Sequence, residues 1–152
     1  MRSYLKKLQY DMIHRIRFRE ERTVSMSYSE INFTKTADLR DYSQIIGSVV
    51  KGTIDRPIGS SHPSKFLDMQ YPVNYGYVNG VMAADGEEQD IYLLGVDQPV
   101  AAFEGIVIAV IHRLNDVEDK WVVAPAGMTF SAEEILRQVE FQEKYFDIQL
   151  HL

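Results

Sequence analysis

Residues 104–113 read EGIVIAVIHR, an apolar run of strand length that is rich in β-branched residues. Such a run, bounded by turn residues, predicts a buried strand. The runs that flank it along the chain have the same character: residues 90–96 read DIYLLGV, and residues 120–125 read KWVVAP. We therefore expect three core strands in this part of the chain, the last of them ended by Pro125.

Two further extended segments precede these runs. Residues 46–54 read IGSVVKGTI, in which β-branched residues partly alternate with others, and residues 71–78 read YPVNYGYV. The segment between them, residues 56–65, is rich in Pro, Gly and Ser and is predicted to be a loop.

The hydrophobic period changes after residue 125. Ile135, Val139 and Phe146 recur at a spacing typical of one helix face, and Ser131 and Glu134 have the spacing of a capping box at the helix start. About five strands followed by a helix predict a fold that is mainly β with some α. We expect a small five-stranded OB-like barrel, antiparallel and closed or nearly closed, with a C-terminal helix packed on it.

The length of the chain, 152 residues, is that of one domain with a single core. We place the barrel domain with its C-terminal helix at residues 45–152, and a basic N-terminal extension with a polar lead-in at residues 1–44. Leu5, Leu8 and Met12 recur at helical spacing, so the extension is predicted to be helical. An arm that binds an anionic partner is the alternative to a solvated or disordered extension, which the composition favours.

Composition excludes several classes of function. The formal net charge of −6 disfavours binding to nucleic acid or to anionic lipid. The chain has no cysteine, so any metal has to be held by oxygen or histidine. No apolar run approaches membrane-spanning length, and the N-terminus lacks the apolar stretch of a signal peptide. We expect a soluble, cytoplasmic protein with no nucleic-acid partner and no membrane partner.

Two acidic clusters lie at the ends of predicted strands: residues 85–90 read DGEEQD, and residues 116–119 read DVED. Magnesium is commonly held by a few carboxylates while phosphate and water complete its shell, so the clusters predict a divalent cation that binds phosphate. The alternative is a pair of solvated surface turns, because DGE alone is a weak motif. A calcium site is disfavoured, since the closing glutamate of an EF-hand loop is missing. Four residues in neighbouring segments suit phosphate: Arg56, Tyr75, Lys120 and Tyr145.

These motifs together resemble the soluble (family I) inorganic pyrophosphatases. The likeness is carried by YPVNYGY at residues 71–77, DGEEQD at residues 85–90, the segment 116–125, and FQEKY at residues 141–145. The resemblance implies a five-stranded barrel with flanking helices. It also implies that a small phosphate compound, pyrophosphate, is the substrate. Bacterial members of the family are commonly hexamers, so we expect a homo-oligomer.

The resemblance further implies a role for each motif residue. Tyr75, Arg56, Lys120 and Tyr145 would bind substrate, and the metal ligands would be Asp85, Asp90, Asp116 and one of Glu118 or Asp119. Magnesium, with manganese as an alternative, would activate a water that Glu87 orients for attack on phosphorus.

The sequence departs from the family pattern at three places. Glu87 stands where the family has an aspartate, and the additional methylene displaces the carboxylate. Phe146 replaces a lysine, which removes one phosphate contact. The early region is compressed, so Arg56 aligns with either a glutamate or an arginine of the family. These departures leave two alternatives open: a catalytically weak or inactive domain that binds a phosphorylated metabolite or a protein partner, and a hydrolase of another diphosphate.

Overall fold

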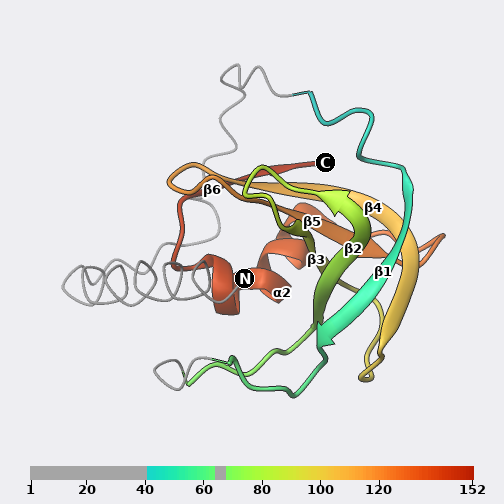
Figure 1. Ribbon diagram of the computed structural model, residues 1–152, viewed down its shortest axis with the longest axis vertical. Coiled ribbons are helices and arrows are strands. Elements are labelled where there is room, and N and C mark those ends of the chain that lie inside the picture. Colours follow the sequence, from blue (N-terminus) through green and yellow to red (C-terminus); the bar gives the residue numbers. More distant parts are fainter. Residues whose placement is uncertain (1–40, 64–67) are drawn as a thin grey trace.

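The computed structural model describes residues 41–63 and 68–152 (Figure 1). The predicted helical extension lies outside the described residues, which begin within the last few positions of the predicted lead-in. Tyr42, the first buried residue in the described part of the chain, belongs to the core cluster of the barrel interior.

Six strands and one helix make up the described fold (Figure 1). The elements are β1 (Val49–Arg56), β2 (Asn74–Met82), β3 (Glu88–Leu93), β4 (Ala102–Arg113), β5 (Asp119–Ala124), α2 (Ala132–Glu143) and β6 (Ile148–His151). The strand order is β1-β2-β3-β5-β4, and β1 pairs again with β4, so that the first five strands close on themselves. This confirms the predicted five-stranded OB-like barrel with a C-terminal helix.

The barrel is not antiparallel throughout. β3 and β5 pair in parallel, with Tyr92 beside Val122, whereas the other pairs are antiparallel. The expectation of an antiparallel barrel was wrong for a geometric reason. Strand direction cannot alternate around a closed ring with an odd number of members, so a five-stranded barrel contains at least one parallel pair.

The C-terminal segment differs from the predicted helix in its last turn. Ser131 caps α2 with the predicted reciprocal bonds to Glu134, but the helix ends at Glu143, and Phe146 lies in the turn that follows. The Leu114 N–H donates to the Asp147 carbonyl over 2.8 Å, and this bond draws the chain back towards the end of β4. The chain then adds β6 to the free edge of β4, a strand that we did not predict.

Two apolar cores lie on opposite faces of the barrel strands. One fills the barrel interior and includes Ile91 and Val123; the other lies between the barrel and α2 and includes Tyr92, Val122 and Val139. Successive strand residues point to opposite faces. Alternate residues of β2, β3 and β5 therefore face α2, and the candidate site is built on that face.

Candidate functional site

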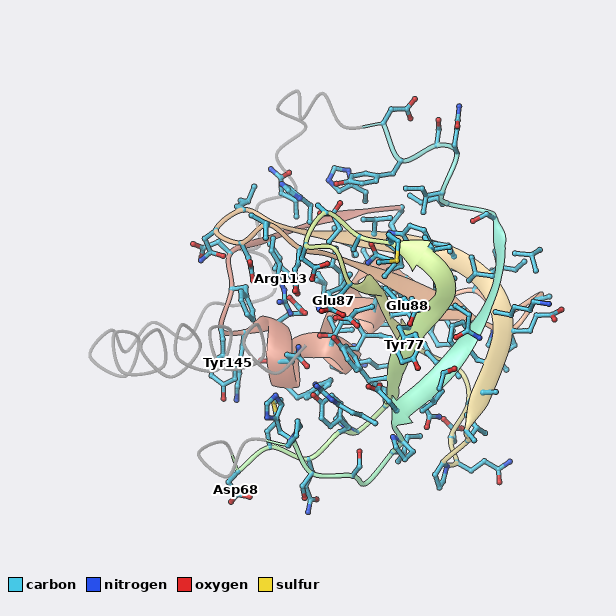
Figure 2. All side chains as sticks on the ribbon, viewed as in Figure 1. Asp68, Tyr77, Glu87, Glu88, Arg113 and Tyr145 are labelled. Atoms are coloured by element: carbon cyan, nitrogen blue, oxygen red, sulfur yellow. The ribbon has the colours of Figure 1, made fainter. Side chains whose placement is uncertain are left out.

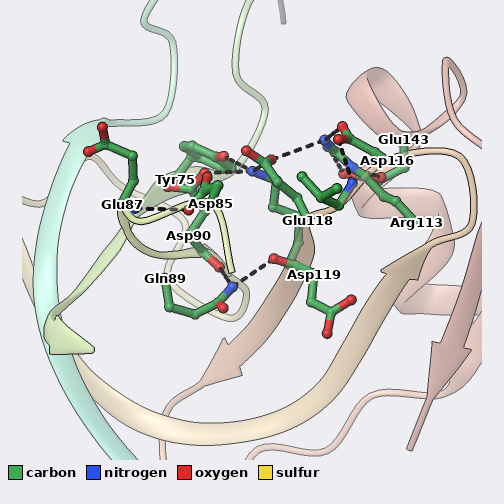
Figure 3. Close-up of polar contacts among 12 residues, drawn as sticks. Tyr75, Asp85, Glu87, Gln89, Asp90, Arg113, Asp116, Glu118, Asp119 and Glu143 are labelled. Atoms are coloured by element: carbon green, nitrogen blue, oxygen red, sulfur yellow. Dashed lines mark hydrogen bonds and ion pairs between the residues drawn. The ribbon is translucent and has the colours of Figure 1, made fainter. Parts of the chain in front are cut away.

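Lys120 is buried in a polar cluster with Tyr75, Asp90 and Glu118, three residues that Figure 3 labels. Its side chain is 3 % exposed, and its Nζ lies 2.5 Å from Asp90 Oδ2 and 2.7 Å from Glu118 Oε2. Nζ also donates to the Tyr75 hydroxyl over 3.0 Å. Burial disfavours the charged ammonium, but Asp90 and Glu118 outweigh burial and raise the pKa of Lys120 above its ordinary value. The lysine is therefore a buried, charged donor.

The barrel topology brings these groups together from separate parts of the chain. Tyr75 pairs with Tyr92 across β2 and β3, and Tyr92 lies beside Val122 across β3 and β5. Asp90 comes two residues before Tyr92 on β3, and Lys120 comes two residues before Val122 on β5. Because the two strands are parallel, the side chains of Asp90 and Lys120 project from the same face of the sheet next to each other. The parallel pair thus places an acid and a base side by side.

Asp85 lies in the turn between β2 and β3. Gly86 takes a positive φ of 82° in this turn, and the Glu87 N–H donates to Asp85 Oδ1 over 2.9 Å. The pKa of Asp85 is raised by burial, and the nearby carboxyls of Glu118 and Asp90 raise it further. The structure therefore gathers negative charge from both predicted acidic clusters.

Arg113 forms a second buried cation next to Lys120. The guanidinium donates two hydrogen bonds to the Glu143 carboxylate of α2, from Nε to Oε2 over 2.9 Å and from Nη2 to Oε1 over 2.6 Å. Its Nη1 lies 3.5 Å from Glu118 Oε2 and 3.6 Å from Asp116 Oδ2. Tyr92 donates its hydroxyl to Glu143 Oε1 over 2.5 Å. Neither Arg113 nor Glu143 was predicted as a site residue; the one available signal was a basic residue at the end of an apolar strand.

Arg56 lies on the Tyr75 side of the cluster. Its Nη1 donates to the Tyr71 hydroxyl over 2.6 Å, and its guanidinium carbon lies 5.4 Å from the centre of the Tyr75 ring. The planar charge thus lies against two aromatic residues of the YPVNYGY segment. Tyr75 in this segment was predicted as a site residue, whereas Tyr71 was not.

The other predicted site residues are Asp119, Tyr145 and Glu87. Both carboxylate oxygens of Asp119 face the other side of the sheet, 2.7 Å from His112 Nδ1 and 2.9 Å from the Tyr42 hydroxyl. Tyr145 lies in the turn just after α2 and packs on the helix-side core (Figure 2). The Glu87 carboxylate points away from Asp85 and Asp90 (Figure 3).

The carboxylates fit a hydrated metal better than a closed protein cage. Among residues 41–63 and 68–152, no three His, Cys, Asp or Glu side chains form a group that could hold a metal ion. Glu118 Oε2 already contacts both buried cations, while Asp90 contacts Lys120 and has a side chain that is 34 % exposed. Asp85 accepts from a backbone N–H. Magnesium needs only one or two carboxylates when water and phosphate supply its other ligands, and Asp85 and Asp90 are the carboxylates that could supply them.

The barrel and this cluster define a class of fold, that of the bacterial inorganic pyrophosphatases. A crystal structure of the inorganic pyrophosphatase from Ehrlichia chaffeensis superimposes with a TM-score of 0.55 at 16 % identity, and covers 70 % of this chain and 86 % of that one. The enzyme from Neisseria gonorrhoeae gives a TM-score of 0.50 at 23 % identity, and covers 69 % of this chain and 81 % of that one.

The sequence also resembles particular members of that class. It is 27 % identical over 143 residues to the inorganic pyrophosphatase of Neisseria meningitidis serogroup A, covering 71 % of this chain and 80 % of that one. A shorter match, 39 % identical over 64 residues, to the Gluconobacter oxydans inorganic pyrophosphatase covers 41 % of this chain and 35 % of that one. These matches confirm the resemblance that the motifs predicted. None of the sequence models of known protein families matches the chain.

The described residues contain no helix that is long and apolar enough to cross a membrane.

Proposed function

We propose that this protein hydrolyses inorganic pyrophosphate to two phosphate ions with the help of magnesium. The observation that carries the proposal is the buried, charged Lys120, which lies between the Tyr75 hydroxyl and the Asp90 carboxylate. A cation and a hydroxyl donor next to carboxylates suit a phosphate that arrives with a divalent ion. The similarity to proteins named inorganic pyrophosphatase supports the same reaction.

We infer that Asp85 and Asp90 hold magnesium, with manganese as an alternative. Asp116 and Glu118 lie further along the same cluster, and the orientation of Asp119 makes it the weakest of the predicted ligands. When bound, the metal would neutralise charge on the phosphate oxygens and lower the pKa of a coordinated water.

The protein groups would then bind and orient the diphosphate. Lys120 and Arg56 would neutralise the oxygens of the phosphoryl groups, and Tyr75 would donate its hydroxyl to them, as we also expect of Tyr145. Water adds to one phosphorus while the bridging P–O bond breaks, and the second phosphate leaves with that bridging oxygen. Glu87 would accept the proton of the water, which requires its carboxylate to turn towards Asp85 from the orientation in Figure 3.

Phosphate release from pyrophosphate in the presence of magnesium tests this proposal. We expect Asp85→Asn and Asp90→Asn to lose activity by about 100-fold or more, because electrostatic stabilisation of the transition state contributes on that scale. Asp97→Asn removes an equivalent charge from an exposed loop and serves as the matched control. Asp85→Asn and Asp90→Asn proteins that kept the parental rate would contradict the assignment.

A domain that binds a phosphorylated metabolite or a protein partner without efficient turnover is the second candidate. The outward orientation of Glu87 favours it, as does the pairing of Glu118 with Lys120 and Arg113. Titration of pyrophosphate, and then of a nucleotide panel, with magnesium present separates the candidates. Tight binding without phosphate release selects the second, and release from a nucleotide alone selects another diphosphate as substrate.

We retain the homo-oligomeric state and the cytoplasmic location as proposals. Light scattering on the purified full chain measures the first, and fractionation of the source cells measures the second.

A further inference from the structure

We propose that Arg113 is a resident cation that takes the place of a divalent metal on the Glu118 side of the carboxylate cluster. Divalent cations are then confined to the Asp85–Asp90 side. This inference rests on the proposed function only in assuming that the cluster binds divalent metal at all.

Arg113 is buried among carboxylates of the cluster. Its side chain is 1 % exposed, and its guanidinium faces three carboxylates, those of Asp116, Glu118 and Glu143. Two of these, Asp116 and Glu118, are residues that the acidic motif marks as metal ligands. A guanidinium cannot be deprotonated in a protein, so the charge at this point is permanent.

The cations of the protein are unevenly distributed among the carboxylates of the cluster. Oε2 of Glu118 lies 2.7 Å from Lys120 Nζ and 3.5 Å from Arg113 Nη1, so protein cations already neutralise this carboxylate. Among the described residues, Lys120 is the one cation that contacts Asp90, and the contacts of Asp85 are with a backbone N–H and with other acids. Within residues 41–63 and 68–152, negative charge is therefore least compensated on the Asp85–Asp90 side, where a divalent cation gains most.

Glu143 and Phe146 fix the position of the Arg113 guanidinium. Glu143 holds the guanidinium with two bonds and is itself held by the Tyr92 hydroxyl. On another side, the guanidinium carbon lies 3.6 Å from the centre of the Phe146 ring. Phe146 is the position at which the resembled family has a lysine. A cation does lie there in this chain, but it comes from β4 and points at the carboxylates.

An ion pair that merely ties α2 to β4 is the alternative role for Arg113. Both roles make Arg113 important for stability, so loss of stability does not separate them. The number of bound metal ions does, because only a resident cation excludes metal from Glu118 and Asp116.

Manganese binding to the full chain, counted by electron paramagnetic resonance and by calorimetry, tests the proposal. The test variant is Arg113→Met with Glu143→Gln, which removes one positive and one negative charge together and leaves no buried charge unpaired. We expect the double variant to bind about one more Mn²⁺ per chain than the parent, because Glu118 and Asp116 become available as ligands. The matched control is Arg137→Met with Glu133→Gln, which breaks an exposed ion pair on the same helix and should bind as many ions as the parent.

A folded double variant with the parental number of ions would overturn the proposal. If that variant does not fold, Asp116→Asn with Glu118→Gln provides the test: the parental number of ions is expected, and loss of an ion contradicts the inference. Phosphate release is measured separately. A parent that binds Mn²⁺ but does not hydrolyse pyrophosphate refutes the proposed function and leaves this inference standing.

Discussion

At the scale of single residues, the cluster shows how charge is kept buried between a small barrel and the helix packed on it. Lys120 and Arg113 are both buried, and each is compensated by carboxylates within 3.6 Å. A buried charge without a partner costs several kcal/mol, about 3–5 kcal/mol when one member of a pair is removed. The motifs predicted Lys120 and Asp90 because they lie in recognisable acidic runs. They did not predict the partnership of Arg113 with Glu143, which joins positions 30 residues apart and depends on where α2 packs.

His62 provides a pH dependence at the residue scale. Burial, and then the nearby Arg56 charge, lowers the pKa of His62 from 6.5 to about 4. The unfolded chain therefore binds a proton at His62 between these two pH values, while the folded chain does not. We expect the free energy of unfolding to fall as pH drops from 6.5 to 4, and this contribution to be fully present above 6.5.

Urea denaturation of the parent and of His62→Gln at pH 7.5 and pH 5 measures that contribution. Other carboxylates also titrate in this range, so the informative quantity is the difference between the two proteins. The variant should lose less stability on acidification than the parent. An equal loss would show that His62 does not contribute.

At the scale of elements, the strands of the barrel were predictable and their pairing was not. The five apolar or β-branched runs correspond to β1 to β5, because a strand that buries a face has to carry that pattern. The register is irregular between Val107 and Ala109, and this shift turns Ile111 and Arg113 towards α2 while Val107 faces the barrel interior. No apolar pattern marks such a bulge. β6 was missed for a similar reason, since its four residues are too few to show a period.

The start of α2 gives a prediction at the element scale. The Ser131 hydroxyl accepts from the Glu134 N–H over 3.2 Å, and the Glu134 carboxylate accepts from the Ser131 N–H over 2.7 Å. Ser131→Ala should lower the free energy of unfolding by about 1 kcal/mol, because it removes one of these bonds from the first turn. Chemical denaturation measures the change.

Thr129→Ala, two positions earlier and outside the cap, is the control for the helix-cap variant. α2 also carries Glu143, so a weaker helix loosens the support of Arg113 as well. A loss of stability in Thr129→Ala equal to that in Ser131→Ala would contradict a role for the capping box.

At the scale of the whole molecule, the barrel and the helix are joined by charge as well as by apolar packing. Ile135 and Val139 of α2 pack on the helix-side core, and Glu143 binds Arg113 beside them. The site is therefore assembled only when the barrel has closed and α2 has docked. The sequence motifs name the donors, but the shared cluster exists only in the complete fold, because its members come from β2, β3, β4, β5, the turns between them and α2.

This dependence predicts that metal binding stabilises the whole domain. The site exists in the folded chain and is lost on unfolding, so a bound ion should raise the free energy of unfolding by about 2.7 kcal/mol at roughly a hundredfold excess over Kd. Thermal unfolding with and without magnesium measures this effect in the parent and in Asp85→Asn with Asp90→Asn, with Asp97→Asn as the charge-matched control. Without metal, the Asp85→Asn change should not lower stability, because burial and the neighbouring acids raise the pKa of this carboxyl. The Asp90→Asn change removes a carboxylate partner of the buried Lys120 and should lower stability, so each protein is compared with itself with and without magnesium. With magnesium, the parent and Asp97→Asn should gain stability while the double variant does not. Equal gains in all three proteins would place the ion away from Asp85 and Asp90.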